Sequence, residues 1–248
     1  MCNLYSVTTN VEAIRAFVRE MRIDLGAIGN FEPQTGVFPD YLAPIVRNFD
    51  GPELSRVRWG MPSSSVAQFE AAKKRAQKLQ AKMGRDLTPE EFRELVANEP
   101  DSGTTNVRNT SSMHWQRWLT PQFRCVVPFN SFSEFNREEG GDIWFAFNDH
   151  RPLAFFAGIW APQWKSVRKI KEGMVTTDLF AFLTTDPNAE MKPIHPKAMP
   201  VILTAPEEVE IWMTASPDEA LKLQRPLSDG SLKIVARGVK EDPPGQTT

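Results

Sequence analysis

The sequence predicts an α+β fold, because strand-like segments are grouped in one part of the chain and helix-like segments lie on both sides of them. Asn10 can cap a helix over residues 10–22, in which apolar residues recur at helical spacing. Extended runs at 43–49 and 54–59 flank Asp50-Gly51-Pro52, which predicts a hairpin. Further apolar runs bounded by turns predict strands at 123–127, 132–135, 143–147, 153–160, 179–184, 199–203 and 232–237.

Residues 66–98 differ in composition from the rest of the chain. The Ala-, Lys- and Gln-rich residues 66–83 predict a helix that ends at Gly84, and the capping box Thr88-Pro89-Glu90-Glu91 predicts a second helix to about Asn98. We interpret the basic face of the helix at 66–83 as a solvent-exposed surface, and the alternative is that it contacts a polyanion. Two more capping boxes, at 204–207 and 216–219, predict C-terminal helices.

Length and charge limit the possible functions. The 248 residues suffice for one large domain, expected over 2–238, followed by a flexible tail at 239–248. A net charge of −2 argues against general affinity for nucleic acid, so any such binding has to come from a local patch. Two cysteines are too few for a disulfide framework, and no apolar run approaches the ~20 residues of a membrane span. We expect a cytoplasmic protein, monomeric and not bound to membranes.

Cys2 is the first candidate for chemistry, because methionine aminopeptidase removes a methionine that precedes a residue this small. The mature chain would then begin with an α-amine next to a thiol. An α-amine titrates near pH ~7.7–8.0 and lysine near ~10.4, so far more of the α-amine is a neutral nucleophile at pH 7. Such an aminothiol condenses with an aldehyde and closes to a thiazolidine ring. The alternative is an ordinary small residue buried under the fold.

Two segments without acidic residues, 102–133 and 191–204, are candidates for an anion-binding surface. Their basic residues are Arg108, His114, Arg117, Arg124, Lys192, His195 and Lys197. Trp115 and Trp118 are available for base stacking, with a place in the core as the alternative.

Glu134 and His195 are the candidates for proton transfer. Glu134 lies in a predicted strand, facing either solvent or a cleft, and a carboxylate there suits the proton shuttling of imine formation and ring closure. His195 lies in the rigid loop Pro193-Ile194-His195-Pro196, a common place for a site residue, although a lone histidine is more often structural. The histidines and cysteines do not have metal-ligand spacing, so no metal is expected.

Several segments, taken in order, resemble one family. They are Met1-Cys2, Arg58-Trp59-Gly60, Asn106-Val107-Arg108, Arg124 to Pro128, Ser133-Glu134-Phe135, Phe156 to Trp160, Leu183-Thr184-Thr185, Ile194-His195 and Met199 to Leu203. Together they are similar to the SRAP family, the SOS response-associated peptidase-like proteins that crosslink to abasic sites in single-stranded DNA. The resemblance spans residues 2 to about 212.

The resemblance implies an SRAP-like α+β fold, with a mixed, mainly antiparallel sheet or barrel core and a helical insertion at about 66–98. It implies that Cys2 attacks the aldehyde of an abasic sugar and ends as a thiazolidine crosslink to single-stranded DNA, protecting the damaged site. Asn106 would hold the sugar or the Cys2 terminus, Glu134 would relay protons, and His195 would assist ring opening or imine protonation. The candidate DNA contacts are Arg108, Trp59, Arg117 and Lys197. The family name implies a peptidase-type activity, in the narrowest case removal of Met1, and no metal or organic cofactor is implied.

The chain departs from the family pattern mainly where DNA would dock. The departures are Asn3-Leu4 for Gly-Arg, Leu42 for Asn, Thr110 for Glu, Phe135 for Trp, Lys197 for Arg with one extra residue in that motif, and a lengthened link from Gly60 to Thr105. They bear on affinity and substrate preference more than on the chemistry. Two alternatives stay open: an N-terminal-nucleophile hydrolase in which residues 66–98 form a lid, and a non-catalytic binding module on the same fold.

Overall fold

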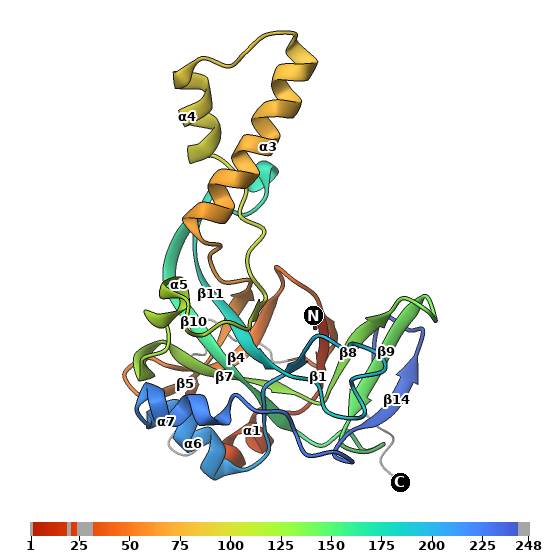
Figure 1. The fold of residues 1–248 in the computed structure, drawn as a ribbon. Helices are drawn as coiled ribbons and strands as arrows, with labels where there is room; N and C mark the ends of the chain where they lie inside the picture. Colours follow the sequence, from red (N-terminus) through yellow and green to blue (C-terminus); the bar gives the residue numbers. More distant parts are fainter. Residues whose placement is uncertain (1, 19–20, 24–31, 243–248) are drawn as a thin grey trace.

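The computed structural model describes residues 2–18, 21–23 and 32–242, and it has the α+β architecture that the sequence predicts. Two sheets lie beside each other, and two helices project from the body of the molecule (Figure 1). The α-helices are α1 (Val11–Phe17), α3 (Ser65–Met83), α4 (Pro89–Ala97), α5 (Met113–Gln116), α6 (Pro206–Thr214) and α7 (Pro217–Ala220). Three 3₁₀ turns are η1 (Pro121–Phe123), η2 (Ile170–Glu172) and η3 (Leu221–Leu223).

The larger sheet has nine strands and is mainly antiparallel. Its order is β12-β11-β10-β7-β4-β5-β2, with β13 paired to β10, β6 paired to β11, and a further parallel pairing between β5 and β11. The strands are β2 (Arg22–Ile23), β4 (Leu42–Asn48), β5 (Pro52–Trp59), β6 (Asn106–Val107), β7 (Arg124–Phe129), β10 (Ala154–Val167), β11 (Met174–Thr185), β12 (Met199–Pro200) and β13 (Ile202–Leu203). The hairpin expected around Asp50 is confirmed as β4 and β5.

The smaller sheet has the order β14-β9-β8-β1-β3 and is antiparallel throughout. Its strands are β1 (Leu4–Val7), β3 (Gln34–Val37), β8 (Ser131–Asn136), β9 (Gly141–Ala146) and β14 (Lys233–Arg237). Beyond β14, the Asp242 N–H donates a 2.8 Å hydrogen bond to the Thr35 carbonyl on β3. This contact joins the two edges of the sheet and closes it into a barrel.

Alternating side chains on the long strands form the two cores. On β10, Phe156 packs toward the smaller sheet in a cluster with Tyr5 and Phe132. Its neighbours Phe155 and Ala157 pack on the opposite face, in the cluster that α1 and α6 cover. The nine-stranded sheet is thus buried on both faces, which explains its continuous apolar runs.

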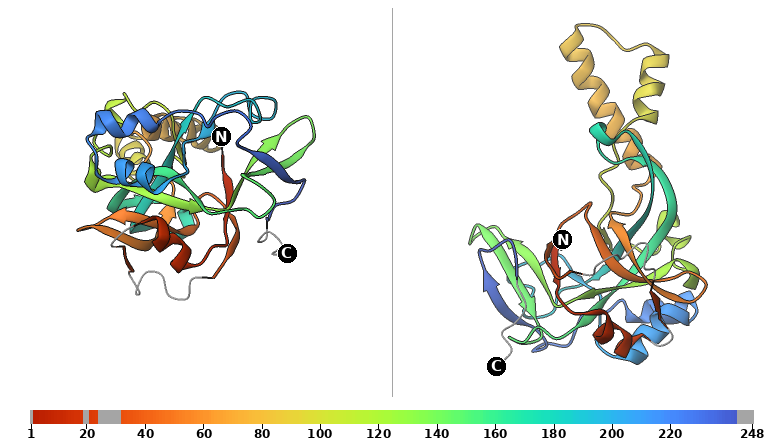
Figure 2. Two further views of the ribbon diagram at one scale, coloured as in Figure 1. Left: turned by 90° about the horizontal axis from the view of Figure 1, so that it is seen from below. Right: turned by 180° about the vertical axis from the view of Figure 1, so that it is seen from behind.

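The insertion is a helical hairpin of α3 and α4 that projects beside the far end of the β10–β11 hairpin (Figures 1 and 2). Both expected boundaries are confirmed: Gly84 ends α3 in a left-handed conformation, and Thr88 and Glu91 form the capping box of α4.

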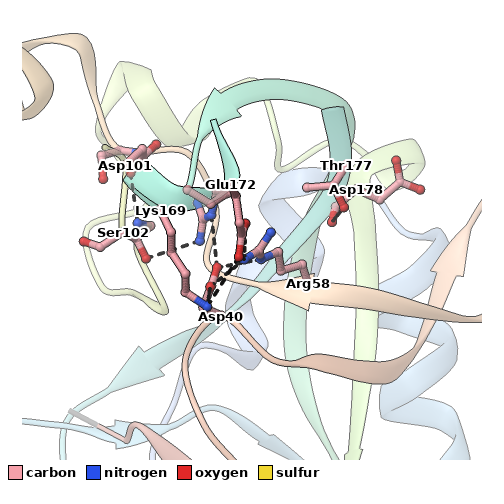
Figure 3. Close-up of polar contacts among 11 residues, drawn as sticks. Asp40, Arg58, Asp101, Ser102, Lys169, Glu172, Thr177 and Asp178 are labelled. Carbon is pink, nitrogen blue, oxygen red and sulfur yellow. Dashed lines mark hydrogen bonds and ion pairs between the residues drawn. The ribbon is translucent and has the colours of Figure 1, made fainter. Parts of the chain in front are cut away.

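A partly buried ionic cluster links the base of the insertion to the body of the molecule (Figure 3). Arg58 and Arg168 both donate to Asp40, at 2.6 and 3.2 Å, and Arg168 also donates to the Ser102 carbonyl at 3.2 Å. Gly103 leaves the space that Arg168 occupies, because a Cβ there would lie 2.6 Å from its Nη2.

Three local expectations are wrong. The helix expected over 10–22 is shorter, because α1 ends at Phe17 and β2 begins at Arg22. Thr204 does not cap α6: Ala205 is the N-cap, and the Thr204 N–H donates to Glu208. Of the tail, residues 239–242 are held against the fold by polar contacts, although only Asp242 is buried: Trp144 donates to the Val239 carbonyl, and Arg151 pairs with Asp242. Residues 243–248 lie outside the described part of the chain.

Candidate active site around Cys2

Cys2 is held at the start of β1, which lies between β3 and β8. Pairing of Leu4 with Ser133 brings the beginning of the chain next to β8. The Cys2 side chain is fully buried, and its thiol lies 3.5 Å from the Leu4 carbonyl oxygen. Burial, and secondarily the nearby Glu134 carboxylate, raise the pKa of the Cys2 thiol well above its usual value. The sulfur is therefore kept as a neutral thiol.

Asn106 fixes the position of the Cys2 backbone. Its side-chain amide donates a 2.8 Å hydrogen bond to the Cys2 carbonyl, across about a hundred residues of sequence. Asn106 is held in place because β6 pairs with β11, opposite Phe182. Within the described residues its Oδ1 atom is buried and has no hydrogen-bond partner, so the amide keeps an acceptor for a bound group.

Glu134 and His195 lie together beside Cys2. The Glu134 side chain, on β8, is 3% exposed, so it faces a cleft and not solvent. Its Oε2 atom is 3.9 Å from His195 Nδ1. Burial raises the pKa of Glu134 to about 7, and burial also lowers the pKa of His195. Near neutral pH, Glu134 can thus both take and give a proton, next to an imidazole that is mostly uncharged.

Glu134 and His195 line a cleft of about 420 Å³, which we call the N-terminal cleft, whereas the fully buried Cys2 lies behind its lining, next to Asn3 and Leu4. It is lined by Asn3, Leu4, Phe38, Pro39, Ser133, Glu134, Phe135, Arg137, Asp142, His195 and Lys240. None of the lining residues comes from the insertion at 66–98. The cleft combines cations, an exposed Phe135 ring and buried proton-transfer groups.

Asn3 and Thr105 are site residues that the sequence did not single out for this role. The Thr105 hydroxyl donates to Asn3 Oδ1 at 2.8 Å, and Asn106 Nδ2 donates to the same oxygen at 3.3 Å. Asn3 stood out only as a departure from the family pattern. No sequence signal pointed to Thr105 beyond its position next to Asn106.

The candidate DNA-contact residues are dispersed. Arg108 is half-exposed and pairs with Asp186 at 2.5 Å, and Lys197 is exposed near His195. Arg117 lies over the Trp118 and Trp164 rings and lines a different pocket, of about 780 Å³, at the base of the insertion.

The expectation that Trp59 contacts DNA is wrong. Its ring is fully buried and stacks on Phe180 and Phe182, at centroid distances of 6.3 and 5.3 Å, and its Nε1–H donates to the Thr105 carbonyl. Its role is to support the strand that leads into Asn106.

The two segments without acidic residues meet at the end of β11. β6, from the first segment, pairs with Phe182 and Leu183, and β12, from the second, pairs with Thr184 and Thr185. The alternative that Trp118 belongs to the core is the one observed, since that ring is buried against Phe123.

Among the described residues, no group of three or more His, Cys, Asp and Glu side chains is arranged to hold a metal ion. Within the same ranges, no helix has the length and apolar character needed to cross a membrane.

The fold and the cleft thus define a protein with a cysteine at the second position, held beside a buried carboxylate, a histidine and an asparagine. The chain belongs to the SRAP family, because the model of the SOS response associated peptidase (SRAP) family matches residues 1–241.

Solved structures share the fold of this chain. A protein from Bacteroides thetaiotaomicron is 20% identical with a TM-score of 0.61, over 94% of this chain and 90% of that one. A protein from Bordetella bronchiseptica is 18% identical with a TM-score of 0.57, over 94% and 97%. A phage-related protein from the same organism is 15% identical with a TM-score of 0.57, over 94% and 92%. No curated protein sequence matches this chain.

Proposed function

We propose that this protein, once Met1 is removed, forms a covalent crosslink through Cys2 to the open-chain aldehyde of an abasic site in single-stranded DNA. The observation that carries the proposal is the convergence of Cys2, Asn106, Glu134 and His195 from four separate parts of the chain. An aminothiol next to a carboxyl group with a pKa of about 7 has the chemistry that aldehyde capture requires.

The reaction would proceed in two bond-forming steps. The Cys2 amine attacks the aldehyde carbon, and loss of one water gives an imine. The thiol sulfur then adds to the imine carbon while its proton passes to the nitrogen, which closes the thiazolidine ring. The complete reaction forms one C–N and one C–S bond and releases one water, so it needs no oxidant or reductant.

The buried groups would divide the proton transfers. Glu134 starts as the carboxylate: it takes a proton from the attacking amine, passes it to the departing hydroxyl and then takes the proton of the thiol, because its pKa lies near the working pH. His195, with a lowered pKa, offers a neutral imidazole to the sugar on the open side of the cleft. Asn106 keeps the Cys2 backbone fixed, so the amine and thiol meet the same carbon atom.

The test is a denaturing gel of the purified protein with a single-stranded oligonucleotide that carries one abasic site. We expect a heat-stable shifted band whose mass equals the protein without Met1 plus the oligonucleotide minus one water. Cys2→Ala should abolish the band. Cys125→Ala, which removes the other buried thiol, should leave it unchanged. A protein that has lost Met1 and gives no band would overturn the proposal.

The hydrolase alternative gains no support from the arrangement of the insertion. A lid formed by residues 66–98 would have to line the N-terminal cleft, and none of them does. Repeated turnover of a small peptide or amide by the mature protein would nevertheless reveal such an activity in the same preparations.

A further inference from the structure

The insertion carries seven basic residues, and they fall into two groups. Four have carboxylate partners within or next to the insertion. These pairs are Lys73–Glu70 at 3.1 Å, Arg75–Glu99 at 3.4 Å, Arg85–Glu91 at 2.6 Å and Arg93–Glu90 at 2.5 Å. The remaining three, Lys74, Lys78 and Lys82, are exposed and form no ion pair with any residue that the structure describes.

The three unpaired lysines form one line along α3, which we call the lysine line. Their spacing of four residues places them on one face of the helix, at a rise of about 6 Å between neighbours and about 12 Å overall. Such a row of like charges repels itself, so it lowers the stability of an isolated helix. An anionic partner laid along the helix would remove that repulsion.

The lysine line faces away from α4. The side of α3 that packs on α4 carries Phe69, which contacts Phe92 at a centroid distance of 5.9 Å, and the buried Ala72 and Ala76. Lys74 and Lys78 each follow one of these alanines by two residues, about 200° around the helix. In Figure 1 and in the right-hand view of Figure 2, α3 lies on the side of α4 that is nearer to β1 and β8. The line therefore faces the side of the molecule that holds the N-terminal cleft.

We propose that Lys74, Lys78 and Lys82 each bind a phosphate of the DNA strand whose abasic site enters the N-terminal cleft. This inference rests on the proposed function, since it assigns a docking surface to the same substrate. One strand of B-form DNA carries a phosphate for each ~3.4 Å of axis, so the ~12 Å length of the line matches about three to four phosphates. The line would supply the local positive patch that a chain with a net charge of −2 needs. It would also offset the loss of an arginine at position 4, where this chain has Leu4.

The test measures how salt affects binding of an undamaged, fluorescently labelled single-stranded oligonucleotide of about 30 nucleotides. All proteins carry Cys2→Ala, so that binding is reversible. The variant Lys74→Gln/Lys78→Gln/Lys82→Gln removes the line. The variant Lys73→Gln/Arg85→Gln/Arg93→Gln removes the same number of charges from the same insertion, at positions that already have partners. Circular dichroism checks that both variants keep their helices.

Each phosphate contact to a single strand adds about 0.7 to the slope of log K against log salt concentration. We expect the lysine-line variant to lower that slope by about 2, so the parent loses about 20-fold more affinity than this variant between 50 and 200 mM salt. The matched variant should keep the slope of the parent. Equal slopes for the two variants would overturn the proposal.

Oligonucleotide length separates this inference from the proposed function. With Cys2 intact, a trinucleotide whose abasic site occupies the cleft has too few phosphates left for the three lysines, so the parent and the lysine-line variant should crosslink to it at nearly the same rate. Only on the longer strand should the variant be slower. A parent that crosslinks to neither substrate overturns the proposed function, and the salt slopes still decide whether the lysine line binds DNA.

Discussion

Asn106 and Cys2 are joined by a 2.8 Å hydrogen bond from the side-chain amide of the one to the backbone carbonyl of the other. The bond is buried, and it holds the start of the chain against a strand of the larger sheet. This single contact connects the two sheets at the point where the proposed reaction takes place.

Replacing Asn106 with Ala should slow crosslinking by about tenfold, the equivalent of one buried hydrogen bond of ~1–1.5 kcal/mol. Asn106→Asp should be slower still, because a carboxylate has no N–H for the Cys2 carbonyl and places a second negative charge near Glu134. The single-turnover rate at saturating DNA measures both effects. Equal rates for the Asp variant and the parent, at unchanged melting temperature, would show that the amide does not position Cys2.

The pH dependence of the crosslinking rate should show the titration of the Glu134 carboxyl group. Because burial raises its pKa to about 7, the fraction present as carboxylate, and with it the rate, should rise through pH 7. Glu134→Gln should remove that inflection and keep only the rise from the α-amine, near pH ~7.7–8.0. His195→Gln should lower the rate but retain the inflection, since the pKa of His195 is shifted down and not up. An inflection that persists in Glu134→Gln and vanishes in His195→Gln would reverse the two roles.

Two substitutions of Asn3 separate its role in positioning Asn106 from the effect of charge in the lining of the cleft. Asn3→Ala removes the acceptor shared by Thr105 and Asn106, so the maximal crosslinking rate should fall several-fold. Asn3→Asp keeps an acceptor there and adds a negative charge to the lining of the cleft. We expect the Asp variant to keep the maximal rate but to need more DNA to reach it, and more so at low salt. A titration of abasic oligonucleotide with each variant gives both quantities.

Adding a side chain at Gly103, next to the ionic cluster at the base of the insertion, should lower the stability of the protein. Gly103 and Gly230 both have a φ of +83°, which strains any other residue. A Cβ at Gly103 would also lie 2.6 Å from Arg168 Nη2, whereas at Gly230 it would meet nothing within 4 Å. Gly103→Ala should therefore lower the melting temperature by more than Gly230→Ala, by at least ~2–4 °C for each additional kcal/mol. Equal losses would mean that Arg168 and the Gly60 backbone, which would lie 2.8 Å from the same Cβ, both move aside without cost.

Features that depend on neighbouring residues were predictable from the sequence. The ends of α3 and α4 follow from Gly84 and from the Thr88 capping box, both of which act within one turn of helix. The predicted capping box at Thr204 is wrong by one position, because Glu208, and not Glu207, accepts the hydrogen bond from the Thr204 N–H. A pattern of residue types does not distinguish two adjacent glutamates.

Features that depend on strand pairing were not predictable. Glu134 and His195 were identified by residue type, but their meeting depends on the pairing of β8 with β1 and of β12 with β11. A DNA contact for Trp59 rests on the family resemblance alone, whereas alternation along β5 turns its ring inward. The polar contacts that hold residues 239–242 are not predictable from neighbouring residues, because their partners, Trp144 and Arg151, are distant in sequence.

The order of strands in the smaller sheet also has a consequence for protein synthesis. β1 is completed on one side by β8, so Cys2 cannot reach its buried position until residues 131–136 have left the ribosome. At ~5–20 residues per second, the beginning of the chain stays accessible for roughly 7 to 27 seconds. Methionine aminopeptidase would thus act on the nascent chain, before folding encloses the new terminus. Molecules that escape this step would fold with Met1 in place and would be inactive as aldehyde traps from the outset.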